Sequence, residues 1–248
     1  MFRKELSWRF EGAKGEIVAH HFRDVPIKTL VISFSHSRKV LSSREGFKEV
    51  RAVCNNFNPP KLWDFVHQNR EIYLGEVLLD LKFSLNEVAM LSTGVDIDDF
   101  ALREEEFEEF KVCAFVTAGV KSNAMRVGVD KAGSIERGGR FEQIGTINTI
   151  LLTNASLSES AMICSIITVT EAKAIALQDL DIRSSYAPKL QATGTGTDQV
   201  IIVSGDGPKV SYSGGHSKIG ELMARVVTSA TKEGILKREE DLRKQGSQ

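Results

Sequence analysis

The segment QATGTGTDQVIIVSG, residues 191–205, brings hydroxyl groups, bare backbone and a carboxylate together directly before an apolar run. Glycine normally weakens a strand, because it loses the most backbone entropy and packs no side chain. If the segment is extended, its threonines share one face and its glycines and aspartate share the other. The members of the two faces are Thr193, Thr195 and Thr197, and Gly194, Gly196 and Asp198. Bare backbone of this kind suits a flat ligand and equally suits tight packing where a strand begins, and the residues leave both interpretations open.

Small polar residues also stand at the ends of two other predicted strands. VTAGVKSN (116–123) ends one apolar strand, and GTINTILL (145–152) begins another. Strand ends that carry Thr, Asn and Gly are typical of binding sites in α/β proteins. The polar side chains concerned are Thr117, Asn123, Thr146 and Asn148.

One predicted helix carries two charged residues in otherwise apolar surroundings. The segment TEAKA (170–174) contains Glu171 and Lys173. Residues two apart do not share a helix face. At most one of the two is therefore expected to point into a given site.

His216 is the histidine best placed for chemistry, because two glycines precede it and leave it accessible. An imidazole titrates near pH 6.5 and can act as a general acid or base at neutral pH. The sequence contains no HExxH, no G-x-S-x-G elbow, no P-loop and no G-x-G-x-x-G after a strand. No metal site is predicted.

Composition narrows the class of protein. The chain has 248 residues, of which 42% are hydrophobic and 26% charged, with a net charge of -1. This balance gives no sign of a nucleic-acid partner. The first residues contain no apolar signal region, and no run reaches the roughly 18 apolar residues of a membrane span. Cys54, Cys113 and Cys164 are far apart, which indicates reduced thiols in a cytoplasmic protein, and the apolar neighbours of Cys113 and Cys164 indicate that these two are buried.

The patterns of the chain predict one α/β domain, with mixed α+β as the alternative, in which long helices cover a largely buried β-sheet. A buried helix is expected to begin at the capping box of Ser156 and Glu159 and to end near residue 178 or 179. A last helix is expected to begin after Ser217, and the charged tail at 235–248 to fray. The acidic segment 96–109 is expected to be a solvated loop or helix face. The predicted strands are 27–35, 71–84, 87–93, 109–119, 146–155 and 199–205.

Five segments, in their order and approximate spacing, resemble the adenosylcobinamide amidohydrolase family. They are VTAGVKSNAMRVG, GTINTILLTNASLSESAM, TEAKAIALQDL, ATGTGTDQVIIV and YSGGHSKIGELMARVV. The resemblance runs from about Thr93 to Val227, whereas residues 1–90 are less similar. There, Ser42 and Ser43 are followed by an arginine, a glutamate and a single glycine in place of the family's glycine cluster.

The resemblance implies a hydrolase of corrinoid salvage. It would cut the amide that joins aminopropanol to a propionate side chain of the corrin ring and give adenosylcobyric acid. A flat corrin could lie against the glycine backbone at Gly194 and Gly196. No cofactor is predicted, since the substrate itself carries cobalt, and the partners expected are this small molecule and a possible second copy of the chain. The alternatives are a corrinoid-binding protein without catalysis and a hydrolase of another amide.

Two mechanisms stay open at this stage. In one, His216 or Asp198 activates water and polar side chains bind the oxyanion. In the other, Thr146 or Thr195 forms a covalent intermediate. The candidate catalytic residues are His216, Asp198, Thr146 and Thr195, and the candidate substrate-binding residues are Thr117, Asn123, Asn148, Glu171, Gly194, Gly196 and Thr197. We expect the catalytic residues to converge on one cleft with Asn148 and Thr197.

Overall fold

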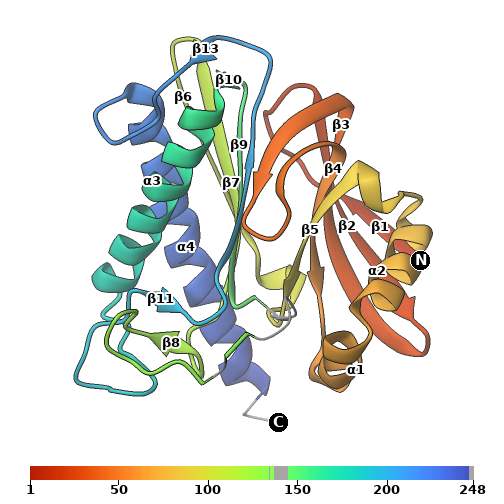
Figure 1. Cartoon of the computed structure of the whole chain (residues 1–248). Coiled ribbons are helices and arrows are strands. Elements are labelled where there is room, and N and C mark those ends of the chain that lie inside the picture. Colours follow the sequence, from red (N-terminus) through yellow and green to blue (C-terminus); the bar gives the residue numbers. More distant parts are fainter. Residues whose placement is uncertain (134, 137–144, 246–248) are drawn as a thin grey trace.

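The computed structural model describes residues 1–133, 135–136 and 145–245 (Figure 1). Its strands are β1 (Phe2–Glu5), β2 (Ala13–Phe22), β3 (Val25–Ser42), β4 (Gly46–Phe57), β5 (Val88–Thr93), β6 (Ala101–Phe107), β7 (Phe110–Ala118), β8 (Ala124–Met125), β9 (Ile147–Thr153), β10 (Ser156–Leu157), β11 (Gly194–Thr195), β12 (Gln199–Val203) and β13 (Lys209–Val210). Its helices are α1 (Trp63–Gln68), α2 (Arg70–Leu81), α3 (Glu159–Asp179) and α4 (Lys218–Gln245), with short 3-10 turns at η1 (Pro60–Leu62), η2 (Leu85–Glu87) and η3 (Ile97–Asp99).

Nine of the described strands form one curled sheet. Its order is β1-β2-β3-β12-β9-β7-β6, while β4 pairs with β3 and β5 pairs with β4. The pairs are antiparallel except for β4 with β5 and β9 with β12. The pairing of β3 with β4 shifts register between Ser33 and Arg38, and such a bulge bends a strand. The two halves of the sheet face each other, with α3 and α4 covering one outer face and α1 and α2 the other (Figure 1).

The alternation of side chains along the strands builds three apolar layers. On β7, Ala114 packs under α3 and α4, whereas Phe115 points between the two halves of the sheet. On β4, Val53 points into the same inner layer, and Cys54 packs under α2. Successive strand residues point to opposite faces, so strands that are buried on both faces read as continuous apolar runs. This is why the chain contains runs such as those of β7, β9 and β12.

The predicted fold class, a mixed α/β single domain with a buried sheet covered by long helices, is confirmed. The strands predicted over 71–84 are wrong, because α2 occupies most of that segment. Tyr73, Leu74, Val77, Leu78 and Leu81 are its buried residues, and this spacing puts them on one helical face. A Cβ added at Gly75 in α2 would meet no atom within 4 Å, so this glycine marks no close approach.

The helix caps agree only partly with the predictions. The N-cap of α3 is Ser158, whose hydroxyl accepts a hydrogen bond from the Ala161 N–H at 3.1 Å, whereas Ser156 lies in β10. Ser217 caps α4 as predicted, since its hydroxyl accepts from the Gly220 N–H at 3.1 Å. Over residues 235–245 the predicted fraying of the tail is wrong, because α4 continues to Gln245, and residues 246–248 lie outside the described residues. Ion pairs one turn apart, such as Glu240 with Lys244, line this end of α4.

The apolar helix α3 is long and apolar enough to cross a membrane, judged by length and composition alone. The most apolar 18-residue part of α3 is 44% buried within the protein. It packs against α4, and its buried residues belong to the apolar layer beneath the sheet. Packing within this fold therefore explains only one face of α3, because Ile163, Ile167 and Ile175 on its outer face are exposed, and the predicted burial of this helix is met only in part.

His20 belongs to a buried polar group between β2, β3 and α2. Its Nε2 lies 2.9 Å from the Thr29 hydroxyl, and its Nδ1 lies 3.4 Å from a carboxylate oxygen of Asp80. Thr29 also accepts a hydrogen bond from the Asn56 side chain at 2.7 Å. Burial lowers the pKa of His20 below its usual value of 6.5, and this outweighs the neighbouring Asp80 carboxylate, which raises it.

The inner layer generates a first prediction. Phe115 is 1% exposed and packs edge-on against Trp8, with the ring of Phe100 stacked at 6.1 Å. Replacing Phe115 with alanine should lower the free energy of unfolding by about 3–5 kcal/mol, because it opens a cavity between the sheet halves. Chemical denaturation measures this. The control Leu79→Ala, at a side chain that is 78% exposed, should change it by less than about 0.5 kcal/mol. Equal effects of the two changes would contradict the layer assignment.

A second prediction concerns pH. Because the pKa of His20 is lowered in the folded protein, the unfolded chain takes up a proton at a higher pH than the folded one. The free energy of unfolding should therefore fall as the pH drops below about 6.5, and His20 should contribute no pH dependence above it. Denaturation between pH 5 and 8 measures this slope. His20→Gln should flatten the slope. The control His36→Gln, at an exposed histidine, should give a steeper slope than His20→Gln does.

Candidate active site

The free edge of β5 frames the candidate site. Since β5 pairs in the sheet only with β4, the groups on its other edge need partners. The Met90 N–H donates to the Glu45 side chain at 3.2 Å, and the Ser92 N–H donates to the Gln199 side chain at 3.4 Å. The Gly145 N–H donates to the Ser92 carbonyl at 2.8 Å. We call this line of contacts along β5 the polar seam.

Beside the polar seam, side chains from four strands form a buried hydrogen-bonded network. The amide of Asn148 donates to the Ser92 carbonyl at 2.8 Å and to Asn55 Oδ1 at 2.9 Å. The Asn55 amide donates to the Thr117 hydroxyl at 2.9 Å, and that hydroxyl lies 3.4 Å from the Thr93 hydroxyl. All of these residues are at least 96% buried. Thr117 and Asn148 thus have protein partners, and they act by fixing the strand ends.

Gly145 can only be glycine in this arrangement. An added Cβ would lie 2.0 Å from Asn148 Oδ1 and 2.8 Å from the Ser92 carbonyl oxygen. Asn148 Oδ1 is buried and has no hydrogen-bond partner among the described residues. The close approach of Gly145 to the seam fixes the backbone at the start of β9, and with it the next residue, Thr146.

Thr146, Thr197 and Asn123 form what we call the hydroxyl cluster. The hydroxyls of Thr146 and Thr197 lie 2.9 Å apart. The Asn123 amide donates to both, at 3.2 Å to Thr146 and 3.1 Å to Thr197. All three side chains are half-buried, so a ligand can reach them, and the exposed Tyr186 hydroxyl lies 3.4 Å from Asn123 Oδ1. A hydroxyl oxygen can attack the carbon of an amide carbonyl, and an amide N–H donor can stabilise the oxyanion that then forms.

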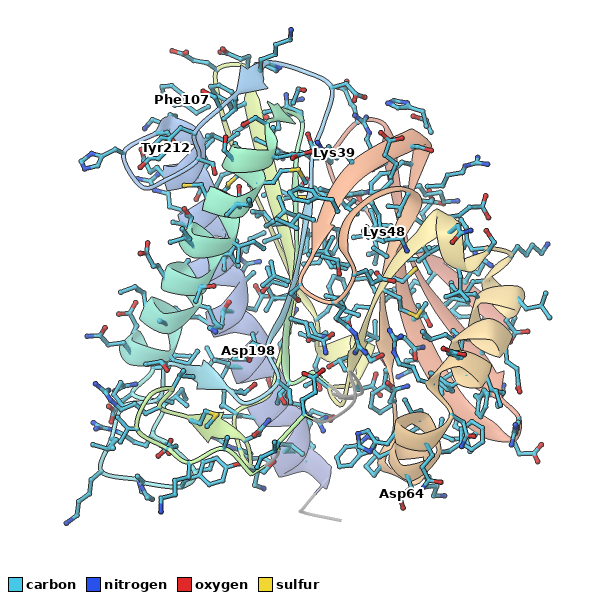
Figure 2. All side chains as sticks on the ribbon, viewed as in Figure 1. Lys39, Lys48, Asp64, Phe107, Asp198 and Tyr212 are labelled. Atoms are coloured by element: carbon cyan, nitrogen blue, oxygen red, sulfur yellow. The ribbon has the colours of Figure 1, made fainter. Side chains whose placement is uncertain are left out.

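Asp198 holds the turn that presents Thr197. Its carboxylate accepts the Thr195 N–H at 3.0 Å and the Thr195 hydroxyl at 2.5 Å. Lys173 of α3 completes the group, with its Nζ 2.5 Å from Asp198 Oδ2. Both charged side chains are more than 80% buried, and such an ion pair is strongest when further hydrogen bonds satisfy it, as here. Asp198 lies near the lower end of the sheet in Figure 2.

This turn corrects the predicted alternation of the segment. Only Gly194 and Thr195 are extended, in β11, and the chain turns at 196–197, so Thr195 and Asp198 meet on one side. An added Cβ at Gly194 would lie 2.4 Å from Asp198 Oδ2 and 2.7 Å from Lys173 Nζ. The bare face of Gly194 is therefore filled by the ion pair and does not face a ligand. Gly196 is exposed, but an added Cβ there would lie 3.1 Å from Asn123 Oδ1 and 3.4 Å from Met125 Sδ, so its bare face also packs closely.

His216 does not join these residues. It is exposed in the turn before α4, after β12 has crossed the sheet, whereas Asp198 precedes β12. The nearby Ser213 contacts Ser165 near the start of α3, eight residues, or about 12 Å along the helix, from Lys173. Figure 2 shows Tyr212 of the same turn at the end of the molecule opposite Asp198. The expected convergence of His216 with the threonines is wrong, because the two loops leave opposite ends of β12.

Glu171 also lies outside the cluster. It is exposed on α3, while Lys173 points to Asp198, so only one of the two reaches the site, as expected from their spacing. The prediction selected the wrong member, because an apolar surrounding sequence does not reveal which face of α3 meets the GTGTD turn.

Asn55, Ser92 and Gln199 were not predicted from the sequence. Each is a polar residue in an apolar strand. For Asn55 the sequence does contain an indication, because it follows Val53 by two positions and so lies on the same inner face of β4. Their function depends on contacts between strands far apart in the chain, which no local pattern contains.

Other chemistries find little support in the part of the chain that the structure describes. No group of three or more His, Cys, Asp or Glu side chains there is arranged to hold a metal ion. Burial raises the pKa of the Cys54 and Cys113 thiols, which keeps them protonated and unreactive. Cys113 is buried, as predicted, whereas Cys164 is only partly buried.

Comparison with known proteins identifies the family. Residues 15–243 match the family described as adenosylcobinamide amidohydrolase (CbiZ). The protein is thus a hydrolase of the class that acts on amide bonds. It belongs to the adenosylcobinamide amidohydrolase family, so the resemblance seen in the sequence is confirmed.

Two relatives cover most of the chain. An uncharacterized protein of Methanocaldococcus jannaschii, MJ1613, is 47% identical over 223 residues, which are 86% of this chain and 87% of the relative. A protein of Methanosarcina mazei named adenosylcobinamide amidohydrolase is 27% identical over 232 residues, 87% of this chain and 96% of the relative.

Two solved structures resemble the fold loosely. The PH0078 protein of Pyrococcus horikoshii has a TM-score of 0.45 and 14% identity, over 91% of this chain and 84% of that protein. The L-aminopeptidase D-Ala-esterase/amidase of Ochrobactrum anthropi has a TM-score of 0.41 and 10% identity, over 91% of this chain and 84% of that protein.

The packing around Gly194 generates a third prediction. Gly194→Ala should push Asp198 away from Lys173 and lower the free energy of unfolding by about 1–3 kcal/mol, because the new methyl overlaps the ion pair. Denaturation measures this. Gly75→Ala is the matched control: it places a methyl in open space inside α2 and should stabilise the protein or leave its stability unchanged. If Gly194→Ala behaves like Gly75→Ala, the assigned packing is wrong.

Proposed function

We propose that this protein hydrolyses the amide that joins aminopropanol to a propionate side chain of adenosylcobinamide, releasing adenosylcobyric acid. Membership of the family supports this reaction, as does the name of the Methanosarcina mazei relative. The observation that carries the proposal is the hydroxyl cluster, in which Asn123 donates to two adjacent threonine hydroxyls at the open end of a buried polar network.

In the proposed mechanism Thr146 is the nucleophile. Its Oγ forms a bond to the amide carbon, and its proton passes to the Thr197 Oγ while Thr197 gives its own proton to the departing aminopropanol nitrogen. The C–N bond then breaks and leaves an ester on Thr146. Water cleaves this ester by the same relay in reverse, which frees the corrinoid acid and restores both hydroxyls.

Asn123 would stabilise the oxyanion. Its Nδ2 donates to both hydroxyls at rest, and a shift of this donor toward the carbonyl oxygen would place it where negative charge develops. The Asn123 Oδ1 faces Tyr186, which orients the amide so that its donor side points to the threonines.

Asp198 would position Thr197 and would not act as a base. Its oxygens accept two hydrogen bonds from Thr195 and pair with Lys173. Both carboxylate oxygens are thus engaged by Thr195 and Lys173, and among the described residues neither oxygen makes a hydrogen bond to Thr146 or Thr197. We therefore assign Thr195 and Asp198 to the support of the turn, and Thr146 to the covalent step.

The cellular location of this activity and its partners are also proposals. We place the protein in the cytoplasm, consistent with its separate free thiols. Its partner would be the small corrinoid, with the cobalt supplied by the substrate, and with neither nucleic acid nor membrane involved. A homo-oligomer stays a prediction.

Incubation with adenosylcobinamide followed by chromatography for adenosylcobyric acid tests the function and supplies the fourth prediction. The wild-type protein should form the product, and Thr146→Ala should lose at least about 10³-fold in kcat, because the nucleophile is gone. His216→Ala should keep wild-type turnover, since that histidine lies at the opposite end of β12.

Two outcomes would overturn parts of this assignment. Normal turnover by a folded Thr146→Ala protein would remove the covalent route through Thr146. Binding of the corrinoid without product, in the wild-type protein, would instead favour a corrinoid-binding protein, and hydrolysis only of other amides would favour a different substrate.

A further inference from the structure

A groove of about 520 Å³ has no role in the chemistry described above. It lies between the first residues of the chain, the end of the β2–β3 hairpin and the end of β4. Apolar and polar side chains line it together, which is the mixture found in sites for large organic ligands. The lining residues used below are Phe2, His21, Lys28, Phe57 and Asp96.

Strand alternation shows that this groove continues the inner layer of the protein. Ile17 of β2 lies in the inner layer, so His21, four residues on, points to the same side. Leu30 of β3 also lies in that layer, which puts Lys28 on the inner side. On β4, Phe57 packs against the inner layer. These three side chains open the groove toward the space between the two halves of the sheet, whereas His20 and Ile27 line it from the side of α2.

The groove lies within reach of Thr146. Phe57 is paired with Thr93 across β4 and β5, and Thr93 is bridged to Gly145, the neighbour of Thr146. Two strand spacings separate Phe57 from Gly145, a distance of about 10 Å. His21 lies on β2, two strands further from Gly145 than Phe57 does, so a ligand centred beside His21 would reach the hydroxyl cluster only through a long side arm extended past Phe57 and along the polar seam.

The two histidines of the groove differ in availability. His20 is 3% exposed and contacts Thr29 and Asp80. His21 is exposed, and among the described residues no hydrogen bond or ion pair to its ring is found. A neutral imidazole without a partner is a ready metal ligand. Cobinamides lack the nucleotide base of complete cobamides, so one axial position of their cobalt is open to a donor atom.

The rim of the groove offers charges for the amide arms of such a ligand. Lys28 Nζ lies 2.9 Å from Asp96 and 2.6 Å from Asp98. The ammonium group can donate to carboxamide oxygens, and the aspartates can accept from carboxamide N–H groups. Phe2 and Phe57 supply apolar surface for the face of a macrocycle.

We propose that this groove binds the corrin ring of the substrate and that the His21 imidazole is an axial ligand of its cobalt. The inference rests on the proposed function, because that function supplies the corrinoid. It assigns the macrocycle and the scissile amide to two sites, the groove and the hydroxyl cluster.

Visible absorption of adenosylcobinamide, titrated with protein in the dark, tests this assignment and is the fifth prediction. Binding to the wild-type protein should shift the band from that of the water-ligated form to that of a nitrogen-ligated form. His21→Ala should bind without this shift, and its dissociation constant and KM should rise at least about tenfold, while kcat changes less. His216→Ala, at an equally exposed histidine outside the groove, should reproduce the wild-type spectrum and affinity.

The outcomes separate this inference from the proposed function. If the wild-type protein hydrolyses the substrate while His21→Ala shows the same spectrum and KM as wild type, the groove assignment is wrong and the function stands. If the wild-type protein neither binds nor hydrolyses adenosylcobinamide, both are wrong. A shift that is lost in His21→Ala but kept in His216→Ala supports the groove assignment, even if turnover is slow.

Discussion

The unpaired edge of β5 is the constraint on which the rest of the site depends. A strand that pairs on one side only leaves a row of N–H and C=O groups that must find other partners. Here these partners are the side chains of Glu45 and Gln199 and the backbone of Gly145. They come from the β3–β4 turn, the start of β12 and the approach to β9. The hydrogen bonds to this one edge thus bring three distant segments together along β5. Thr146 directly follows Gly145, which makes one of these bonds.

The same constraint explains where glycine is required. At Gly145 the backbone lies so close to Asn148 and to the Ser92 carbonyl that no side chain fits. Gly194 makes room for the Asp198–Lys173 pair. The two alternating glycines therefore both serve close packing: Gly194 makes room for the ion pair, and the exposed Gly196 makes room for the Asn123 side chain of the hydroxyl cluster.

The sequence predicts features that depend on local patterns, and it misses those that depend on contacts between segments far apart in the chain. Strand ends with Thr and Asn predicted that Thr146, Asn123 and Thr197 meet, and they do, because a parallel pair such as β9 and β12 brings its corresponding ends together. His216 was misassigned, since a short glycine-flanked turn indicates accessibility but not the end of the sheet at which it lies. The helix α2 was mistaken for strands because its apolar residues include adjacent pairs, which suit either period. Ser92 and Gln199 were missed because their role arises only when the two sheet halves curl together.

The location of the charges is the reason why we propose a hydroxyl, rather than a carboxylate, as the reactive group. Lys173 and Asp198 neutralise each other next to the turn, and both hydrogen bonds that Asp198 accepts from the turn come from Thr195. The fixed charges therefore hold the backbone of the turn, and the hydroxyl cluster beside them contains only neutral groups. Between it and the inner layer lies a network of Asn and Thr side chains in which the Asn55 and Asn148 amides both donate to protein acceptors. A neutral, half-buried cluster supported in this way can bind an uncharged amide without desolvating an ion, and its hydrogen-bond donors act in a medium of low dielectric constant, where they stabilise a developing oxyanion more strongly than they would in water.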